Sequence, residues 1–108
     1  MADVKIKGYV VRLNRRGPDE FKLEIGRKVF GHVIGRKGSL STAGLRQSIR
    51  ILELGDGGIN LGGQNILVLK NGPMRILRMD YEGDIRQIAL SPIEIEAITR
   101  MAQEVLDS

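Results

Sequence analysis

Hydrophobic and polar residues alternate along the first third of the chain, as they do in strands of an antiparallel sheet. Residues 4 to 13 are rich in β-branched residues, and the interruption at Gly8 predicts a bulge. A turn sequence at 16 to 19 follows, and apolar residues then alternate with charged ones from 21 to 25. The pattern predicts two long strands joined as a hairpin, with the second strand continuing to Ile34.

The middle of the chain changes character. Residues 39 to 48 contain few β-branched residues and predict a short helix or a loop, whereas 49 to 54 resemble a buried strand. Five glycines in the nine positions 55 to 63 predict a mobile connection. Turn residues then separate three short apolar runs in the spacing of an antiparallel meander, at 65 to 70, 74 to 80 and 85 to 90.

The last segment has the pattern of an amphipathic helix. Ser91, Pro92 and Glu94 stand at the N-cap, first and third positions of a capping box. An apolar stripe at helical spacing follows, formed by Ile98, Met101, Ala102 and Val105. We therefore predict an α+β fold in a single domain over residues 1 to 108, with an antiparallel sheet of about five to six strands and this helix packed on one face.

Charge divides the chain into two unequal halves. Residues 1 to 50 hold twelve Lys and Arg against four Asp and Glu, a balance of +8. Residues 51 to 108 hold five basic and nine acidic residues, a balance of −4. A strongly basic half predicts a polyanionic partner, and the phosphate backbone of a nucleic acid is the commonest polyanion.

The candidate phosphate contacts are basic residues of this half, together with two glycines whose backbone N–H groups could bind anions. They are Lys5, Lys7, Arg12, Arg15, Arg16, Arg27, Lys28, Gly35, Arg36, Lys37, Gly38 and Arg46. Tyr9 and Phe30 lie in the same half and would stack on bases if they face outward. Phe21 shares the parity of the apolar residues beside it and is predicted to be in the core.

Several function classes are disfavoured by what the sequence lacks. There is no Cys, and the single His32 lies in a predicted strand without a nucleophile motif, so we expect it to be structural or exposed to solvent. We predict no enzyme activity, no catalytic residue, no metal and no cofactor. No apolar run approaches the length of a membrane span and no secretory signal is evident, so we expect a cytoplasmic protein that does not bind membranes.

One short motif resembles a known nucleic-acid clamp. The run Phe30-Gly-His-Val-Ile-Gly-Arg-Lys-Gly-Ser39 is similar to the Gly-x-x-Gly loop of K-homology domains, which clamps single-stranded nucleic acid. The resemblance implies phosphate contacts from residues 35 to 38. The tetrapeptide Ile-Gly-Arg-Lys occurs at both 25 to 28 and 34 to 37, which places two Arg-Lys pairs beside glycines.

The C-terminal third, residues 71 to 106, resembles the strand, strand and helix that end PUR-type and Whirly-type single-strand-binding domains. The resemblance implies a curved antiparallel sheet that binds nucleic acid and a helix used for packing or dimerisation.

Together these features predict a small nucleic-acid-binding protein that acts through phosphate contacts, with single-stranded DNA or RNA favoured over duplex. The alternative is a protein-assembly module, in which the basic face meets an acidic protein and the C-terminal helix forms a homodimer. Binding to anionic lipid is a poorer third reading, because no basic amphipathic helix is visible.

Overall fold

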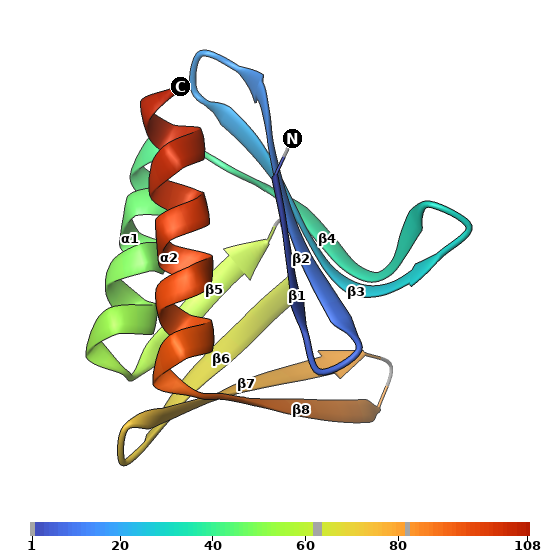
Figure 1. Cartoon of the computed structure of the whole chain (residues 1–108), viewed down its shortest axis with the longest axis vertical. Helices are drawn as coiled ribbons and strands as arrows, with labels where there is room; N and C mark the ends of the chain where they lie inside the picture. The colour runs from blue at the N-terminus through green and yellow to red at the C-terminus, as the bar shows by residue number, and fades with distance from the viewer. Residues whose placement is uncertain (1, 62–63, 82) are drawn as a thin grey trace.

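The computed structural model describes residues 2–61, 64–81 and 83–108. They form two successive units of the same order, each with four antiparallel strands followed by a helix (Figure 1). The first unit contains β1 (Ala2–Ile6), β2 (Tyr9–Gly17), β3 (Glu20–Val29), β4 (His32–Leu40) and α1 (Thr42–Leu54). The second contains β5 (Gly57–Leu61), β6 (Gln64–Asn71), β7 (Met74–Tyr81), β8 (Asp84–Leu90) and α2 (Pro92–Asp107).

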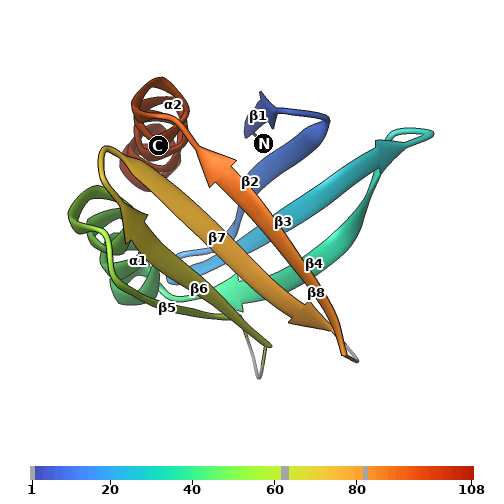
Figure 2. The ribbon, with the colours of Figure 1, turned by 90° about the horizontal axis from the view of Figure 1, so that it is seen from below.

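The α+β class, the antiparallel pairing and the packed C-terminal helix are confirmed. The prediction of one sheet with five to six strands is wrong, because the described residues form two four-stranded sheets, each a meander in chain order. The two helices lie side by side at one end of the molecule, and the tips of the β3–β4 and β7–β8 hairpins lie at the other (Figure 2).

Helix α1 replaces the strand expected at 49 to 54. Its N-cap is Ser41, whose Oγ accepts a hydrogen bond of 3.0 Å from the backbone N–H of Gly44. The helix packs against α2 and against strands of both sheets, so it is buried on more than one side. Its apolar positions Ile49, Ile51 and Leu52 therefore run together in sequence, which explains their resemblance to a buried strand.

Three other local predictions also change. Residues 57–61 of the expected mobile connection form β5, which is stabilised by pairing with β6, and Gly62 and Gly63 lie outside the described residues. Gly8 forms no bulge but lies in the turn from β1 to β2, where its φ is 82°. The register shifts instead between Arg15 and Gly17 in β2.

The expected long second strand is a tight hairpin made of β3 and β4. Phe30 and Gly31 form its turn with φ angles of 48° and 82°. The two Ile-Gly-Arg-Lys segments lie on opposite strands and pair in antiparallel register, with Gly26 facing Gly35. The repeated tetrapeptide is therefore a feature of this hairpin.

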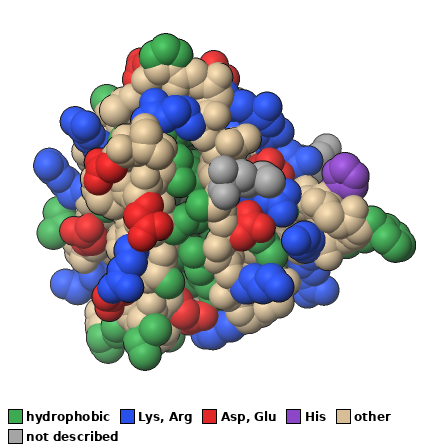
Figure 3. All heavy atoms as spheres, turned by 45° about the horizontal axis from the view of Figure 1, so that its top comes forward, with side chains coloured by type: hydrophobic (Ala, Val, Ile, Leu, Met, Phe, Trp, Pro, Cys, Tyr) green, Lys and Arg blue, Asp and Glu red, His purple; other side chains and the backbone are tan. Residues whose placement is uncertain are grey.

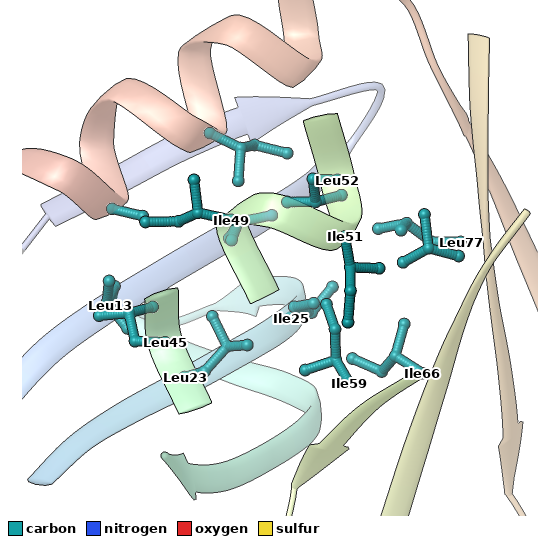
Figure 4. Packing of buried hydrophobic residues seen from close by; sticks show 14 of the residues in the cluster. Leu13, Leu23, Ile25, Leu45, Ile49, Ile51, Leu52, Ile59, Ile66 and Leu77 are labelled. Carbon is teal, nitrogen blue, oxygen red and sulfur yellow. The ribbon is translucent and has the colours of Figure 1, made fainter. Parts of the chain in front are cut away.

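A single hydrophobic cluster joins both sheets and both helices, and side chains of α1 lie at its centre (Figure 4). Helix α2 has the predicted capping box. The Ser91 N–H donates to Glu94 Oε1 at 2.9 Å, and the Glu94 N–H donates to Ser91 Oγ at 3.3 Å. Ile98, Met101 and Ala102 of its apolar stripe are buried in the cluster, and Phe21 is in the core as predicted.

Candidate nucleic-acid interface

The β1–β4 sheet has one face in the core and one face turned outward, because residues alternate between the faces of a strand. Basic side chains collect on the outward face, which we call the basic face. Its basic members are Lys5, Arg12, Arg16, Lys22, Lys28 and Lys37, and its acidic members are Asp3, Glu20 and Glu24. Lys22 was not among the predicted contacts, although its alternation with Phe21 and Leu23 would have placed it there.

Two of these cations are held by carboxylates of the same face. Arg12 Nε lies 2.8 Å from Asp3 Oδ1, and Lys22 Nζ lies 3.7 Å from Glu24 Oε1. The other four are exposed and form no ion pair with any residue that the structure describes. Each comes from a different strand of the sheet, and together they are Lys5, Arg16, Lys28 and Lys37.

The electrostatic environment of Asp3 shows how closely the cations gather. The hydrogen bond from Arg12 is the main cause that lowers the pKa of this carboxyl below its usual value, and the charges of Arg12, Lys28 and Lys5 lower it further. One carboxylate is thus surrounded by cations from three strands. The basic face consequently keeps an excess of positive charge.

The β3–β4 hairpin of the basic face is curved (Figure 1), and its two strands approach closely where Gly26 pairs with Gly35. A Cβ at Gly35 would lie 2.2 Å from the backbone oxygen of Ile25, so the strands approach more closely than side chains allow. Val10 and Val33 lie on the outward face, yet their exposed fractions are only 4% and 1%. Neither belongs to the hydrophobic cluster that joins the sheets and helices.

Beyond this bend the hairpin projects from the body of the molecule, with the side chain of Phe30 98% exposed at its tip. Figure 3 shows Lys and Arg side chains around the base of this projection, next to His32, the only histidine of the chain. His32 is exposed. Phe30 therefore faces outward, as a base-stacking residue must.

The structure places five of the predicted basic phosphate contacts away from the basic face. Arg27 lies on the inner side of β3, over the Tyr9 ring. Lys7 Nζ donates a 2.8 Å hydrogen bond to the backbone oxygen of Ala89, which connects the first unit to the second. Arg15 covers the Phe21 ring and donates to backbone oxygens, and Arg46 lies on α1. Arg36 points to the inner side of the sheet and is 8% exposed.

The prediction of a loop at residues 35 to 38 is wrong, because these residues lie inside β4 and pair with β3. Gly38 is needed for packing, since a Cβ there would lie 2.4 Å from the Cβ of Leu61 in β5. The glycines thus let strands approach one another. Of residues 35 to 38, Lys37 is the one that places an exposed cation on the basic face.

A second feature lies where the inner faces of the two sheets separate. A cleft of about 580 Å³ opens there, which we call the inter-unit cleft. Its lining comes from both units and consists of Tyr9, Ile25, Gly26, Arg27, Val29, Ile34, Gly35, Arg36, Lys37, Met79 and Arg86. Arg86 was missed because it lies in the acidic half of the sequence, far from the other basic residues of the cleft.

The inter-unit cleft is built from equivalent positions of the two units. Arg36 pairs in register with Ile25 in the first sheet, and Arg86 pairs with Met79 in the second. Each pair joins the last strand of a unit to the strand before it, and all four residues line the cleft. Corresponding strand positions of the two units therefore face one another across the cleft.

No family model matches the chain, and no curated protein is similar to it. Among the residues the structure describes, no three His, Asp or Glu side chains gather as a metal site would require. No helix of this described part is long and apolar enough to cross a membrane.

Proposed function

We propose that this chain is a non-enzymatic protein that binds single-stranded nucleic acid through phosphate contacts on the basic face. The observation that carries the proposal is the set of four exposed cations, one on each strand of a single sheet, that form no ion pair within the described part of the chain. Exposed Lys and Arg release counterions from a nucleic acid when they contact its phosphates, and this release supplies affinity without sequence preference.

Two arguments favour single strands over duplex. The cations lie on a curved sheet, and the PUR-type and Whirly-type domains that residues 71 to 106 resemble use a curved antiparallel sheet for single strands. In addition, Phe30 is fully exposed at the end of this sheet, where an unpaired base could stack on its ring. The K-homology resemblance adds no support, because its residues 35 to 38 lie in a strand.

The test is a fluorescence titration of labelled single-stranded and duplex DNA and RNA with the wild type and two charge-reversed variants. Lys28→Glu with Lys37→Glu reverses two cations of the basic face. Arg46→Glu with Arg50→Glu reverses two exposed cations on α1 and is the matched control. All four side chains are exposed, so folding should survive each change.

We expect the first variant to lose single-strand affinity by roughly tenfold or more, and the α1 variant to lose much less. Equal losses would mean that the chain binds through its total charge rather than through this face. A larger loss from the α1 variant would move the interface to that helix. Absence of binding by the wild type to every probe would overturn the proposed function.

A second candidate function is self-association, and one observation favours it. The outward face of the β5–β8 sheet exposes Leu67, Leu69 and Ile85, with exposed fractions of 44%, 38% and 48%. Arg78 and Asp80 lie on the same face, so two copies could pair opposite charges across a two-fold axis. The apolar stripe of α2 is not available for the predicted helix dimer, because it is buried within one chain.

Sedimentation velocity separates the candidates. A homodimer through this face should dissociate when Leu67→Lys and Leu69→Lys are combined, while a nucleic-acid-binding monomer should sediment identically before and after the change. The basic face lies on the other sheet, so its nucleic-acid affinity gives an independent reading of the same variant.

A further inference from the structure

We propose that the inter-unit cleft holds one nucleotide, with its base on the Arg27 guanidinium and its phosphate between Arg27, Lys37 and Arg86. The inference rests on the proposed function, because it takes the nucleotide to be part of the bound strand. The cleft would then add a pocket for a base to a surface that otherwise contacts phosphates and offers the ring of Phe30 for stacking.

The size and charge of the cleft fit this ligand. Its volume of about 580 Å³ lies within the range of small-molecule sites. Among the residues that the structure describes, its lining contains three arginines and a lysine and no Asp or Glu, so it favours an anion and disfavours a cation. Apolar side chains form the rest of the wall, which suits the faces of a base, and they are Ile25, Val29, Ile34 and Met79.

Arg27 and Tyr9 provide a place for the base. The Arg27 guanidinium carbon lies 5.6 Å from the centre of the Tyr9 ring, and Arg27 is exposed whereas Tyr9 is half-buried. The Arg27 guanidinium thus lies over the Tyr9 ring, and both residues line the cleft. Unpaired bases stack on both aromatic rings and guanidinium planes.

The cleft is continuous with the basic face. Strand β4 is the edge strand of its sheet, and Lys37 both lies on the basic face and lines the cleft. A strand whose phosphates follow the basic face can therefore turn over this edge. One of its bases then enters the space between the two sheets while Lys37 contacts the phosphate at the turn.

The test uses two matched substitutions. Ile34→Glu introduces a carboxylate into the cleft at a side chain that is 62% exposed. Ile85→Glu makes the same change in the second unit, at a side chain that is 48% exposed and faces away from the cleft. Arg27→Leu is a third variant that removes the stacking plane, and Arg27 is also exposed. Each change is therefore compatible with folding.

Two probes distinguish the possible sources of the nucleotide. One is a single strand of about twelve nucleotides, within the usual site size, that contains one 2-aminopurine at an internal position. Its fluorescence falls when the base stacks on a ring or a guanidinium plane. The other is free AMP, which offers the same base and phosphate chemistry without a strand, and its binding is measured by calorimetry.

We expect the wild type to bind the strand and to quench 2-aminopurine. Ile34→Glu and Arg27→Leu should remove the quenching and weaken the strand by roughly 5- to 100-fold, the range for loss of one stacked base. Ile85→Glu should change neither signal. Suppose that the wild type binds AMP but not the strand, and that Ile34→Glu weakens the binding of AMP. The cleft would then still be a nucleotide site, and the proposed function would be overturned.

The reverse result would overturn the cleft while sparing the proposed function. In that result the wild type binds the strand without quenching 2-aminopurine at any position, or Ile34→Glu and Ile85→Glu bind the strand with equal affinity. If the wild type binds neither the strand nor AMP, both proposals fail.

Discussion

Arg15 and Arg75 each hold the C-terminal end of a helix that belongs to the other unit. Arg15, in the first unit, donates from Nη2 to the backbone oxygen of Leu106 in α2 at 3.0 Å. Arg75, in the second unit, donates to the oxygens of Leu52 and Glu53 in α1 at 3.0 and 2.8 Å. Carbonyls at the end of a helix lack partners within it, so each unit completes the helix of the other.

Arg75→Met should therefore destabilise the protein far more than a surface change. Arg75 is 9% exposed, and its guanidinium bonds four backbone oxygens, two of them at the end of α1. Its loss leaves buried acceptors without a donor, so we expect a cost of about 3 kcal/mol in the free energy of unfolding. Arg78→Met, on the outward face of the same strand, is the control and should cost less than about 0.5 kcal/mol in urea denaturation.

Gly35→Ala tests whether the bend of the β3–β4 hairpin depends on close backbone contact. The new Cβ would lie 2.2 Å from the Ile25 oxygen, so the strands must separate, at a cost of roughly 2 kcal/mol or more. Gly58→Ala in β5 meets only the Leu67 side chain, at 3.9 Å, and should be neutral or slightly stabilising. Thermal melting compares the two, and equal melting temperatures would show that the bend tolerates a side chain.

Acid should weaken the fold through the capping box of α2. Hydrogen bonds from Ser91, chiefly from its backbone N–H, and to a smaller extent the charge of Lys7 lower the pKa of Glu94 below its ordinary value of 4.5. The stability from ionised Glu94 is therefore fully present above pH 4.5 and is lost as the pH falls through the lower pKa of the folded state. In Glu94→Gln the free energy of unfolding should no longer show this acid-dependent loss.

Glu104→Gln removes an exposed carboxylate from the same helix and serves as the control for this measurement. Its free energy of unfolding should follow that of the wild type from pH 7 down to about pH 3. If Glu94→Gln shows the same acid loss as the wild type, the capping carboxylate does not contribute.

Salt provides a direct measure of the basic face. Four phosphate contacts on a single strand predict that log K falls against log salt concentration with a slope of about −2.8. Replacing Lys28 by Ala should reduce the magnitude of that slope by about 0.7, because one contact is lost. The measurement is a titration at several salt concentrations, and a slope near zero would exclude this binding mode.

The sequence predicts those elements whose local signals agree with their final environment. The Ser91 capping box defines α2, and turn residues separate the strands of the second meander. Helix α1 is predicted only in part, as a short helix or a loop over residues 39 to 48. Gly44 stands where a capping box has Glu, and packing on several sides hides the helical period of the rest. Strand β5 escapes prediction because its glycines have low strand propensity, which pairing with β6 overcomes.

The candidate site is predictable only in part for a related reason. Alternation along a strand assigns Lys28 and Lys37 to one face once the register is known, but the register follows from a turn at Phe30 that the sequence did not reveal. Arg36 has the charge of a phosphate contact, yet the same register turns it inward. The inter-unit cleft joins Tyr9 to Arg86, and only the packing of one sheet on the other brings them together.

Because each unit bonds the end of the other unit's helix, we expect the two units to unfold together. If one unit opened alone, it would withdraw the arginine that closes the other unit's helix, and the shared cluster would lose the side chains of one sheet. We therefore expect a half-folded chain to lack a stable core of its own, and amides in α1 and α2 to exchange with solvent at similar free energies. The two units thus repeat one topology, whereas the cooperative unit of unfolding is the whole chain.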